Sequence, residues 1–213
     1  FKAGETQANG EITIKREGMA VVDYLLPLQL GECSNNGVIC QEEICYLKVG
    51  RTYTNPIISD KSVPDPTVIR ANDGYFYLYA TQTSTYWMPI YRSKDLVNWE
   101  YQKTAFTQAT KPSLSGGGAF WAPEMTYING KYVLYFSWAK MNGADVSYTA
   151  VAVSDSPLGP FPNSKALITN EEFGSNVIDQ FYYEENGKKY MFFGSFKGIY
   201  VTELTDDGLS VKR

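Results

Sequence analysis

Short strand-like runs rich in aromatic side chains recur along this chain. Residues 75–79 read YFYLY and residues 132–136 read YVLYF, each directly after a tight turn. A period of two is typical of a β-strand whose successive side chains face opposite sides of a sheet. These segments lack the spacing of an amphipathic helix, so the pattern predicts a fold built from β-strands.

The aromatic runs belong to an internal repeat of strand, tight turn and strand. Its three copies read DPTVIRANDGYFYLYAT from Asp65, APEMTYINGKYVLYFSW from Ala122 and DQFYYEENGKKYMFFGS from Asp179. The turn glycines recur 56 and then 57 residues apart. The Asn-Gly or Asp-Gly pair in each turn supplies the positive φ angles that a short hairpin requires.

Each copy is followed by a second pair of predicted strands around a polar turn, at 91–100, 152–161 and 200–211. Four strands in a repeat of this length are typical of a β-propeller blade. A blade buries its faces only against neighbouring blades, so three blades cannot close a ring. We therefore expect an all-β propeller with about three blades in this chain and the missing blades supplied by the rest of a parent chain.

The pattern changes before the repeat begins. Glycines separate shorter predicted strands at 11–15 and 21–30, and the blade motif is missing. The run FKAGETQANGEITIKREG followed by DYLLPLQL resembles the closing strands of β-sandwich modules that precede catalytic domains in surface glycan-degrading proteins of the Bacteroidetes. We expect part of a small β-sandwich over residues 1–50 and the propeller blades over residues 51–213. The resemblance also implies that the chain is truncated at both ends and that its parent is exported.

Charge and composition exclude several classes of function. The net charge is −4 without a basic cluster, so no nucleic-acid partner is expected. The most apolar run, 20–30, is interrupted by charge and proline and is too short to span a membrane. The chain has no histidine, which excludes a mixed Cys/His zinc site for Cys33, Cys40 and Cys45. Two interpretations of these cysteines remain open: a disulfide between the first two, or three small apolar residues.

The repeat brings two carboxyl groups to equivalent positions. Asp65, Ala122 and Asp179 each start the innermost strand of a blade, and these starts converge at the mouth of the central channel. Carboxyl groups around an aromatic pocket point to glycoside hydrolysis, in which an acid protonates the leaving oxygen and a base activates water. A structural alternative is that Asp65 only begins a strand before Pro66 and Asp179 caps a turn.

Three segments in order, 55–81, 120–137 and 176–195, resemble the successive blade signatures of the family 43 glycoside hydrolases. This family contains the arabinanases, α-L-arabinofuranosidases and β-xylosidases, and its fold is a five-bladed β-propeller. The resemblance covers about residues 52–213 and implies an inverting mechanism that requires no cofactor. Some family members hold calcium in the channel, but nothing here identifies a ligand.

The resemblance also implies roles for the two aspartates. Asp65, in its Val-Pro-Asp-Pro motif, would be the general base. Asp179, in Val-Ile-Asp-Gln-Phe, would adjust the pKa of the general acid and help to hold the substrate. The acid itself is a glutamate of a later blade, and no matching motif follows Asp179, so we expect it beyond this segment. Glu203 lies in a strand-turn segment and is expected to be structural.

Several aromatic residues are candidate substrate contacts. Trp121 precedes Ala-Pro-Glu, and its ring would form an apolar floor under a sugar, although a core position between blades explains it equally well. Trp87 and Phe120 lie in segments expected at the same channel mouth. Trp99 is expected in the outer core of a blade, and Trp138 has no assigned role.

Two polar residues flank the Asp179 hairpin, Asn176 and Ser195, and they are expected to donate hydrogen bonds to sugar hydroxyls. Together the motifs indicate a glycosidase acting on arabinose- or xylose-containing plant polysaccharides, located outside the cytoplasm. We expect the 213 residues alone to be inactive. A carbohydrate-binding propeller without catalytic activity is the alternative, and a purely structural propeller would leave the two aspartates unexplained.

Overall fold

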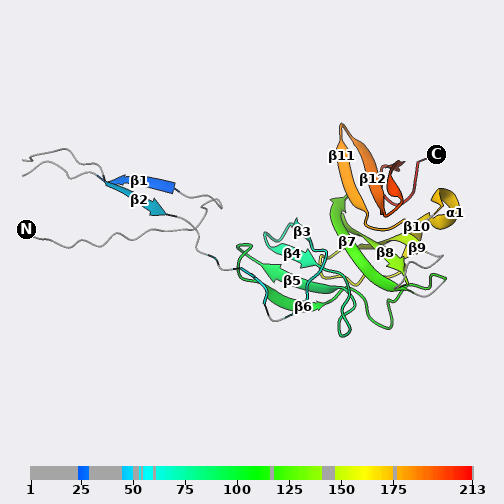
Figure 1. Cartoon of the computed structure of the whole chain (residues 1–213), viewed down its shortest axis with the longest axis horizontal. Coiled ribbons are helices and arrows are strands. Elements are labelled where there is room, and N and C mark those ends of the chain that lie inside the picture. The colour runs from blue at the N-terminus through cyan, green and yellow to red at the C-terminus, as the bar shows by residue number, and fades with distance from the viewer. Residues whose placement is uncertain are drawn as a thin grey trace, which may run out of the picture. The chain divides into compact units, whose positions relative to one another are not determined.

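The computed structural model describes residues 24–28, 45–49, 53, 55–59, 61–115, 118–140, 147–174 and 177–212. Its chain divides into two units, residues 1–54 and 55–213 (Figure 1). In the first unit, β1 (Tyr24–Leu28) and β2 (Cys45–Val49) form an antiparallel pair. The β-sandwich expected over residues 1–50 and the pairing of Cys33 with Cys40 fall mainly outside the described residues.

The second unit consists of antiparallel sheets in which consecutive strands are neighbours. The first sheet contains β3 (Thr67–Arg70), β4 (Phe76–Tyr79), β5 (Pro89–Ser93) and β6 (Glu100–Thr104). The second contains β7 (Ala119–Ile128), β8 (Lys131–Ala139), β9 (Ser147–Ser154) and β10 (Lys165–Thr169). The third contains β11 (Phe181–Glu185), β12 (Lys188–Ser195) and β13 (Gly198–Leu204). Apart from the short helix α1 (Asn170–Phe173), the described elements are strands, which confirms the all-β class.

The hairpins between the first two strands of each sheet form where the repeat places them. In the second sheet the turn is Asn129-Gly130, with φ angles of 49° and 81°. In the third sheet it is Asn186-Gly187, with φ angles of 52° and 77°. Two positive φ angles in succession match the right-handed twist of the flanking strands, so the Asn-Gly chemistry sets the register of both hairpins.

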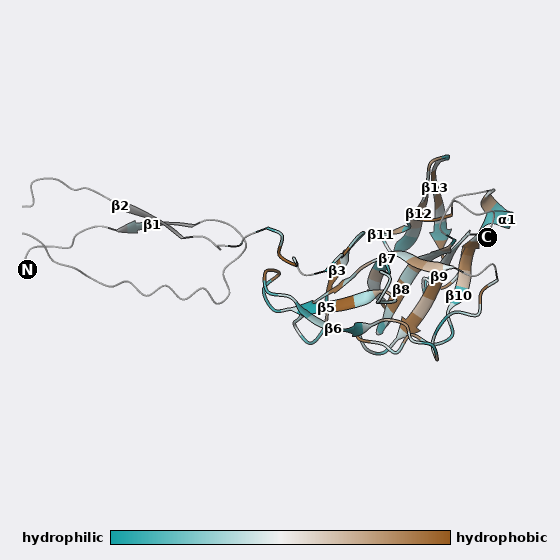
Figure 2. Cartoon of the chain, turned by 60° about the horizontal axis from the view of Figure 1, so that its bottom comes forward, coloured by the Kyte–Doolittle hydropathy of each residue, from teal (hydrophilic) through white to brown (hydrophobic). Residues whose placement is uncertain are grey.

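Strand β8 is buried on both faces, and its alternating side chains contribute to two separate cores. The side chains at 132, 134, 136 and 138 join the core shared with the first sheet, while those at 133 and 135 join the core shared with the third. Figure 2 shows strongly hydrophobic segments within the sheets, including parts of β5 and β9. The period of two in the sequence therefore becomes two sheet-to-sheet interfaces, as in neighbouring propeller blades.

The first strands of the three sheets lie together. Strand β7 contacts β3 on one side and β11 on the other, as the ribbon in Figure 1 shows. The beginnings of these three strands are consequently close in space, although they are more than 50 residues apart in sequence. This arrangement positions the residues of the candidate site.

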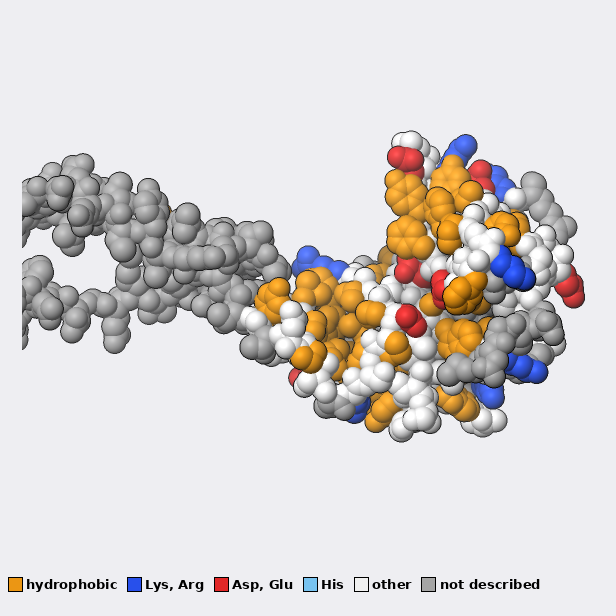
Figure 3. Space-filling model, in the orientation of Figure 1, with side chains coloured by type: hydrophobic (Ala, Val, Ile, Leu, Met, Phe, Trp, Pro, Cys, Tyr) orange, Lys and Arg blue, Asp and Glu red, His pale blue; other side chains and the backbone are white. Residues whose placement is uncertain are grey.

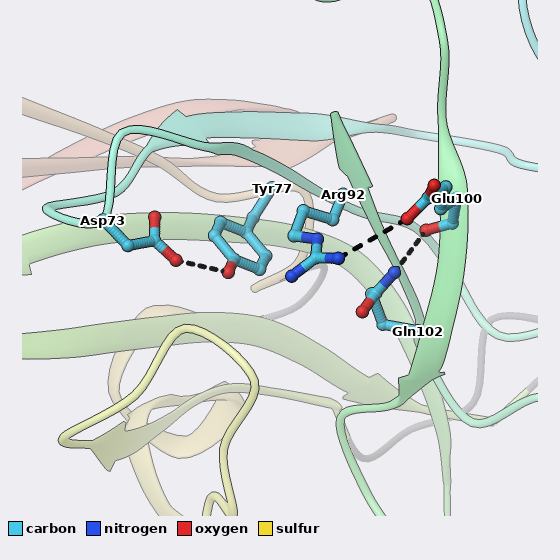
Figure 4. A network of polar contacts seen from close by, with 5 residues as sticks. All are labelled: Asp73, Tyr77, Arg92, Glu100 and Gln102. Atoms are coloured by element: carbon cyan, nitrogen blue, oxygen red, sulfur yellow. Dashed lines mark hydrogen bonds and ion pairs between the residues drawn. The ribbon is translucent and has the colours of Figure 1, made fainter. Parts of the chain in front are cut away.

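A polar network holds the hairpin loop and the outer strands of the first sheet (Figure 4). The Tyr77 hydroxyl donates to Asp73 Oδ2 at 2.7 Å, and Arg92 donates to Glu100 Oε2 at 3.4 Å. Burial and the neighbouring Asp73 carboxylate raise the pKa of Tyr77 to about 12, so its hydroxyl remains a donor. Tyr77 also interacts with Arg92, so the network links the loop before β4 to the edge strand β6.

The third sheet exposes an apolar face. The strand pairing places Phe181, Phe192 and Val201 in one cross-strand row, and their exposed fractions are 55%, 37% and 53%. Tyr183 and Ile199 are also exposed on this sheet, and Figure 3 shows hydrophobic side chains gathered where β11 lies. The predicted fourth strand of this sheet is reduced to a single bridge from Leu204 to Val211. Within the described residues nothing covers this face, although faces of this kind are normally buried against a neighbour.

Candidate active site

The three equivalent repeat positions share an unusual backbone conformation. Asp65, Ala122 and Asp179 have φ angles of 49°, 39° and 55°. The left-handed region costs a non-glycine residue about 1–2 kcal/mol, so it is uncommon. Its occurrence at three equivalent positions indicates that the fold requires this conformation there. At Ala122 it accompanies a β-bulge between Trp121 and Glu124, where β7 carries one residue more than β8. Asp65 and Asp179 thus lie at a bend just before β3 and β11, and Ala122 lies at a bend near the start of β7.

Both aspartates line one pocket of about 570 Å³. The pocket receives residues from the starts of β3 and β11, from the end of β4 and its following loop, and from β7. Its lining consists of Asp65, Thr81, Gln82, Thr83, Ser84, Ala119, Trp121 and Asp179. Two carboxyl groups, several hydroxyl or amide groups and one indole ring provide the polar groups and apolar surface that a sugar requires.

Asp65 is held by a hydroxyl group from the neighbouring strand end. The Thr81 hydroxyl donates to Asp65 Oδ2 at 2.6 Å, and the Thr81 backbone N–H donates to the carbonyl of Pro64 at 3.0 Å. The Ala122 backbone N–H in turn donates to Thr81 Oγ1 at 2.7 Å. These bonds tie the start of the first sheet to the bend in the second.

Asp179 has an environment that disfavours its charge. Partial loss of hydration is the main cause that raises the pKa of Asp179, and the negative charge of Asp65 raises it further. A hydrogen bond with Ser195 acts in the opposite direction. Asp65 and Asp179 are therefore close enough for the charge of one to affect the protonation of the other.

Replacing Asp179 by asparagine is expected to stabilise the fold at neutral pH. Because the native pKa is raised, the native chain binds more protons than the unfolded chain between the two pKa values. The contribution of Asp179 to the free energy of unfolding therefore decreases as pH rises through this interval. We expect Asp179→Asn to unfold at a higher temperature than the parent at pH 7, with the difference disappearing below about pH 3.9, the usual pKa of aspartate.

Thermal unfolding of both proteins between pH 3 and 8, an interval around the usual aspartate pKa of about 3.9, would measure this effect. Asp206→Asn is the control, because it makes the same change at an exposed aspartate in the turn after β13. A lower unfolding temperature for Asp179→Asn at pH 7 would contradict the assignment of a destabilising charge.

Glu124 connects the three inner strands but does not line the pocket. Its Oε2 accepts a hydrogen bond from the Thr67 hydroxyl at 3.1 Å, and its Oε1 accepts one from the backbone N–H of Tyr182 at 3.3 Å. Burial raises the pKa of Glu124, and both hydrogen bonds oppose that rise. Because Thr67 belongs to β3 and Tyr182 to β11, the Glu124 side chain joins the inner strands of all three sheets by hydrogen bonds.

The aromatic candidates separate into one pocket residue and several core residues. Trp121 lines the pocket. Phe120 is only 1% exposed, and its ring stacks on Phe106 with centroids 4.5 Å apart, which corrects its expected role as a substrate contact. Successive residues of a strand face opposite sides, so Trp121 and Phe120 cannot both face the pocket. Trp87 packs against the same core, 6.1 Å from the Phe120 ring, and is not among the pocket-lining residues. Trp138 is buried there as well.

The remaining sequence candidates have varied positions. Ser195 contacts Asp179 itself, and Asn176 lies outside the described residues. Trp99 packs in the small outer core of the first sheet and donates to the carbonyl of Leu96 at 3.1 Å, as a structural residue does. Glu203 pairs with Lys212 at 2.8 Å and is not part of the pocket lining.

Sequence reasoning missed Thr81 and Gln82 in the pocket and the buried residues Ser137 and Gln180 beside it. A signal was present, because each copy of the repeat has a hydroxyl residue at the end of its second strand: Thr81, Ser137 and Ser195. The hairpin pairing places that hydroxyl beside the first residue of its own copy. Thr81 contacts Asp65 and Ser195 contacts Asp179 in this way, whereas Ser137 pairs with Trp121, one residue before Ala122.

Comparison with known proteins agrees with this geometry. The sequence profile of the glycosyl hydrolases family 43 matches residues 53–213, and the chain belongs to this family. It is 30% identical over 156 residues to extracellular endo-α-(1→5)-L-arabinanase 1 of Bacillus subtilis, a match covering 68% of this chain and 47% of the arabinanase. It is 31% identical over 150 residues to a xylan 1,3-β-xylosidase of Vibrio, covering 66% of this chain and 26% of that enzyme.

A solved structure gives the same result for the fold. The α-L-arabinanase of Cellvibrio cellulosa, complexed with arabinohexaose, superimposes with a TM-score of 0.60 and 29% identity. The superposition covers 72% of this chain and 51% of the arabinanase. The chain therefore spans about half the length of the arabinanases it matches.

Two further properties bear on cofactors and membranes. Within the described residues, no group of three or more His, Cys, Asp or Glu side chains has an arrangement that can hold a metal ion. The described residues also contain no helix of the length and hydrophobicity needed to cross a membrane.

Proposed function

We propose that the complete protein carrying this chain is an inverting glycosidase that cleaves arabinose- or xylose-containing plant polysaccharides or oligosaccharides. The observation that carries this proposal is the pair Asp65 and Asp179, which come from different blades and line one pocket beside Trp121. The names of the relatives support the substrate class, because they include an arabinanase and a xylosidase.

In this mechanism Asp65 is the general base. Its carboxylate takes a proton from a water molecule as the water oxygen forms a bond to the anomeric carbon. The glycosidic C–O bond breaks on the opposite face of the sugar, and a general acid protonates the leaving oxygen. The configuration at the anomeric carbon is inverted because a single displacement occurs.

In this proposal Asp179 adjusts the pKa of the general acid and contacts the substrate. Its raised pKa and its electrostatic coupling to Asp65 support a position beside the reacting groups. We place the general acid, a glutamate, outside these 213 residues. Among the described residues that line the pocket, only Asp65 and Asp179 carry carboxyl groups. The exposed face of the third sheet is then covered by a further blade of the same protein.

The protein acts outside the cytoplasm in this proposal. The support is indirect and comes from relatives, among them the extracellular arabinanase of Bacillus subtilis and an extracellular exo-α-(1→5)-L-arabinofuranosidase of Cellvibrio japonicus.

The test measures hydrolysis of aryl arabinofuranosides, aryl xylosides, arabinan and xylan by the complete protein, with the anomeric configuration of the first product followed by NMR. We expect hydrolysis of at least one substrate with inversion, and none by residues 1–213 alone. Hydrolysis with retention would overturn the mechanism. Binding of the polysaccharides without hydrolysis would instead support the alternative, a carbohydrate-binding propeller.

A further inference from the structure

Two hydroxyl groups make the same contact between neighbouring sheets. Thr81 Oγ1, at the end of the first hairpin, accepts the backbone N–H of Ala122 at 2.7 Å. Ser137 Oγ, at the equivalent position of the second hairpin, accepts the backbone N–H of Asp179 at 3.0 Å. In both cases the donor is the positive-φ residue at the first position of the following copy of the repeat. A contact that occurs twice at one repeat position is a regular feature of this architecture.

These contacts determine where each hydroxyl directs its own proton. A backbone N–H can only donate, so a hydroxyl that accepts from it has its hydrogen available for a different acceptor. The Thr81 proton goes to Asp65 Oδ2 at 2.6 Å. The second hairpin begins with Ala122, which has no carboxylate, and the Ser137 proton goes to Gln180 Oε1 at 3.0 Å.

Gln180 completes a path between the two aspartates. Its side chain is 5% exposed, and its Nε2 donates to the carbonyl of Ala122 while its Oε1 accepts from Ser137. The path therefore runs through alternating donors and acceptors in the order Asp65, Thr81, Ala122, Gln180, Ser137 and Asp179. The donor and acceptor directions of Thr81, Gln180 and Ser137 are set by their neighbours, so the path connects the carboxylate of Asp65 to the backbone of Asp179.

We infer that Thr81 is a positioning residue for the general base. Its hydroxyl oxygen accepts from the Ala122 amide, so its own hydrogen is directed to Asp65 Oδ2, and this bond holds the carboxylate so that Oδ1 takes the proton from water. This inference rests on the proposed function, because it requires Asp65 to be the base. Thr81 does not itself exchange a proton with the substrate.

The test compares Thr81→Val, Thr81→Ala and Thr81→Ser in the complete protein. Removing the hydroxyl is expected to lower kcat by about 10- to 100-fold with KM changed by less than about 3-fold, because a misplaced base affects the reaction more than binding. Thr81→Ser keeps the hydroxyl and is expected to retain activity within about 5-fold of the parent.

Thr104→Val is the matched control. It removes a hydroxyl that donates to the carbonyl of Phe106 at 2.8 Å in the same sheet but outside the pocket, and we expect its kinetics to be unchanged. Thermal unfolding of every variant separates loss of fold from loss of positioning.

Kinetics of Thr81→Val and Thr81→Ala within about 3-fold of the parent, or an equal loss in Thr81→Ser, would overturn the inference. If Asp65→Asn also remained active, the proposed function itself would fail. If Asp65→Asn were inactive while the Thr81 variants had normal kinetics, only the positioning role of Thr81 would be rejected.

Discussion

Replacing Asp65 by asparagine in the complete protein should lower kcat/KM for aryl arabinofuranosides and xylosides by about 10²- to 10⁴-fold, the usual contribution of a general base. The substitution changes little else, because the asparagine carbonyl oxygen can still accept the hydrogen bond that Asp65 Oδ2 receives from Thr81. What the variant loses is an oxygen able to take a proton from water. The unfolding temperature should stay close to that of the parent.

Initial rates over a range of substrate concentrations would measure this loss. Asp155→Asn is a suitable control, since Asp155 is an exposed aspartate that pairs with Lys131 in a different part of the second sheet. Activity of Asp65→Asn within a few-fold of the parent would remove Asp65 as the base and would favour the non-catalytic alternative.

Replacing Gly194 by alanine is expected to cause a larger loss of stability than the same change at any other glycine that the structure describes. The φ angle of Gly194 is 121°, a conformation that alanine rarely adopts, and its added Cβ would overlap the carbonyl oxygen of Gly198 across the β12–β13 turn. The overlapped atoms belong to the backbone of Gly198 and Ile199, so no side-chain rotation can relieve the contact. We expect the free energy of unfolding to fall by about 3 kcal/mol or more, the sum of backbone strain and steric overlap.

The same substitution is expected to disturb the candidate site. The Gly194 backbone N–H donates to the carbonyl of Ile178 at 2.8 Å, directly before Asp179, so a shift of Gly194 displaces the aspartate. Gly187→Ala is the matched control. Its φ of 77° also strains an alanine, but a Cβ there meets no atom within 4 Å, so a loss of only about 1 kcal/mol is expected. Equal losses in urea unfolding would show that overlap at Gly194 is unimportant.

Local chemistry explains why much of the fold could be predicted. The Asn-Gly turns at 129–130 and 186–187 require positive φ whatever surrounds them, and the structure has both. The period of two in residues 132–136 predicts that successive side chains face opposite sides of the sheet. In the structure, alternate side chains of β8 are buried in two different cores. The repeat of these local signals placed Asp65 and Asp179 at equivalent strand starts, and they do line one pocket.

The partners of the site could not be predicted, because they depend on contacts between sheets. Thr81 meets the Ala122 backbone 41 residues away, and Gln180 meets the same residue from 58 residues away. A hydroxyl at a strand end has no local preference for such a partner. The candidate Phe120 failed for a related reason, since only the bend at the start of the second sheet decides that Trp121 faces the pocket and Phe120 the core.

The features that could be predicted and those that could not differ in the range of the interactions that produce them. Turn chemistry and strand period act over a few residues, so the amino-acid sequence alone establishes the all-β repeat, its hairpins and the equivalence of Asp65, Ala122 and Asp179. Hydrogen bonds between blades, the burial and the Asp65 charge that raise the pKa of Asp179, and the covering of each apolar face require packed neighbours. Those features therefore exist only in the packed tertiary structure.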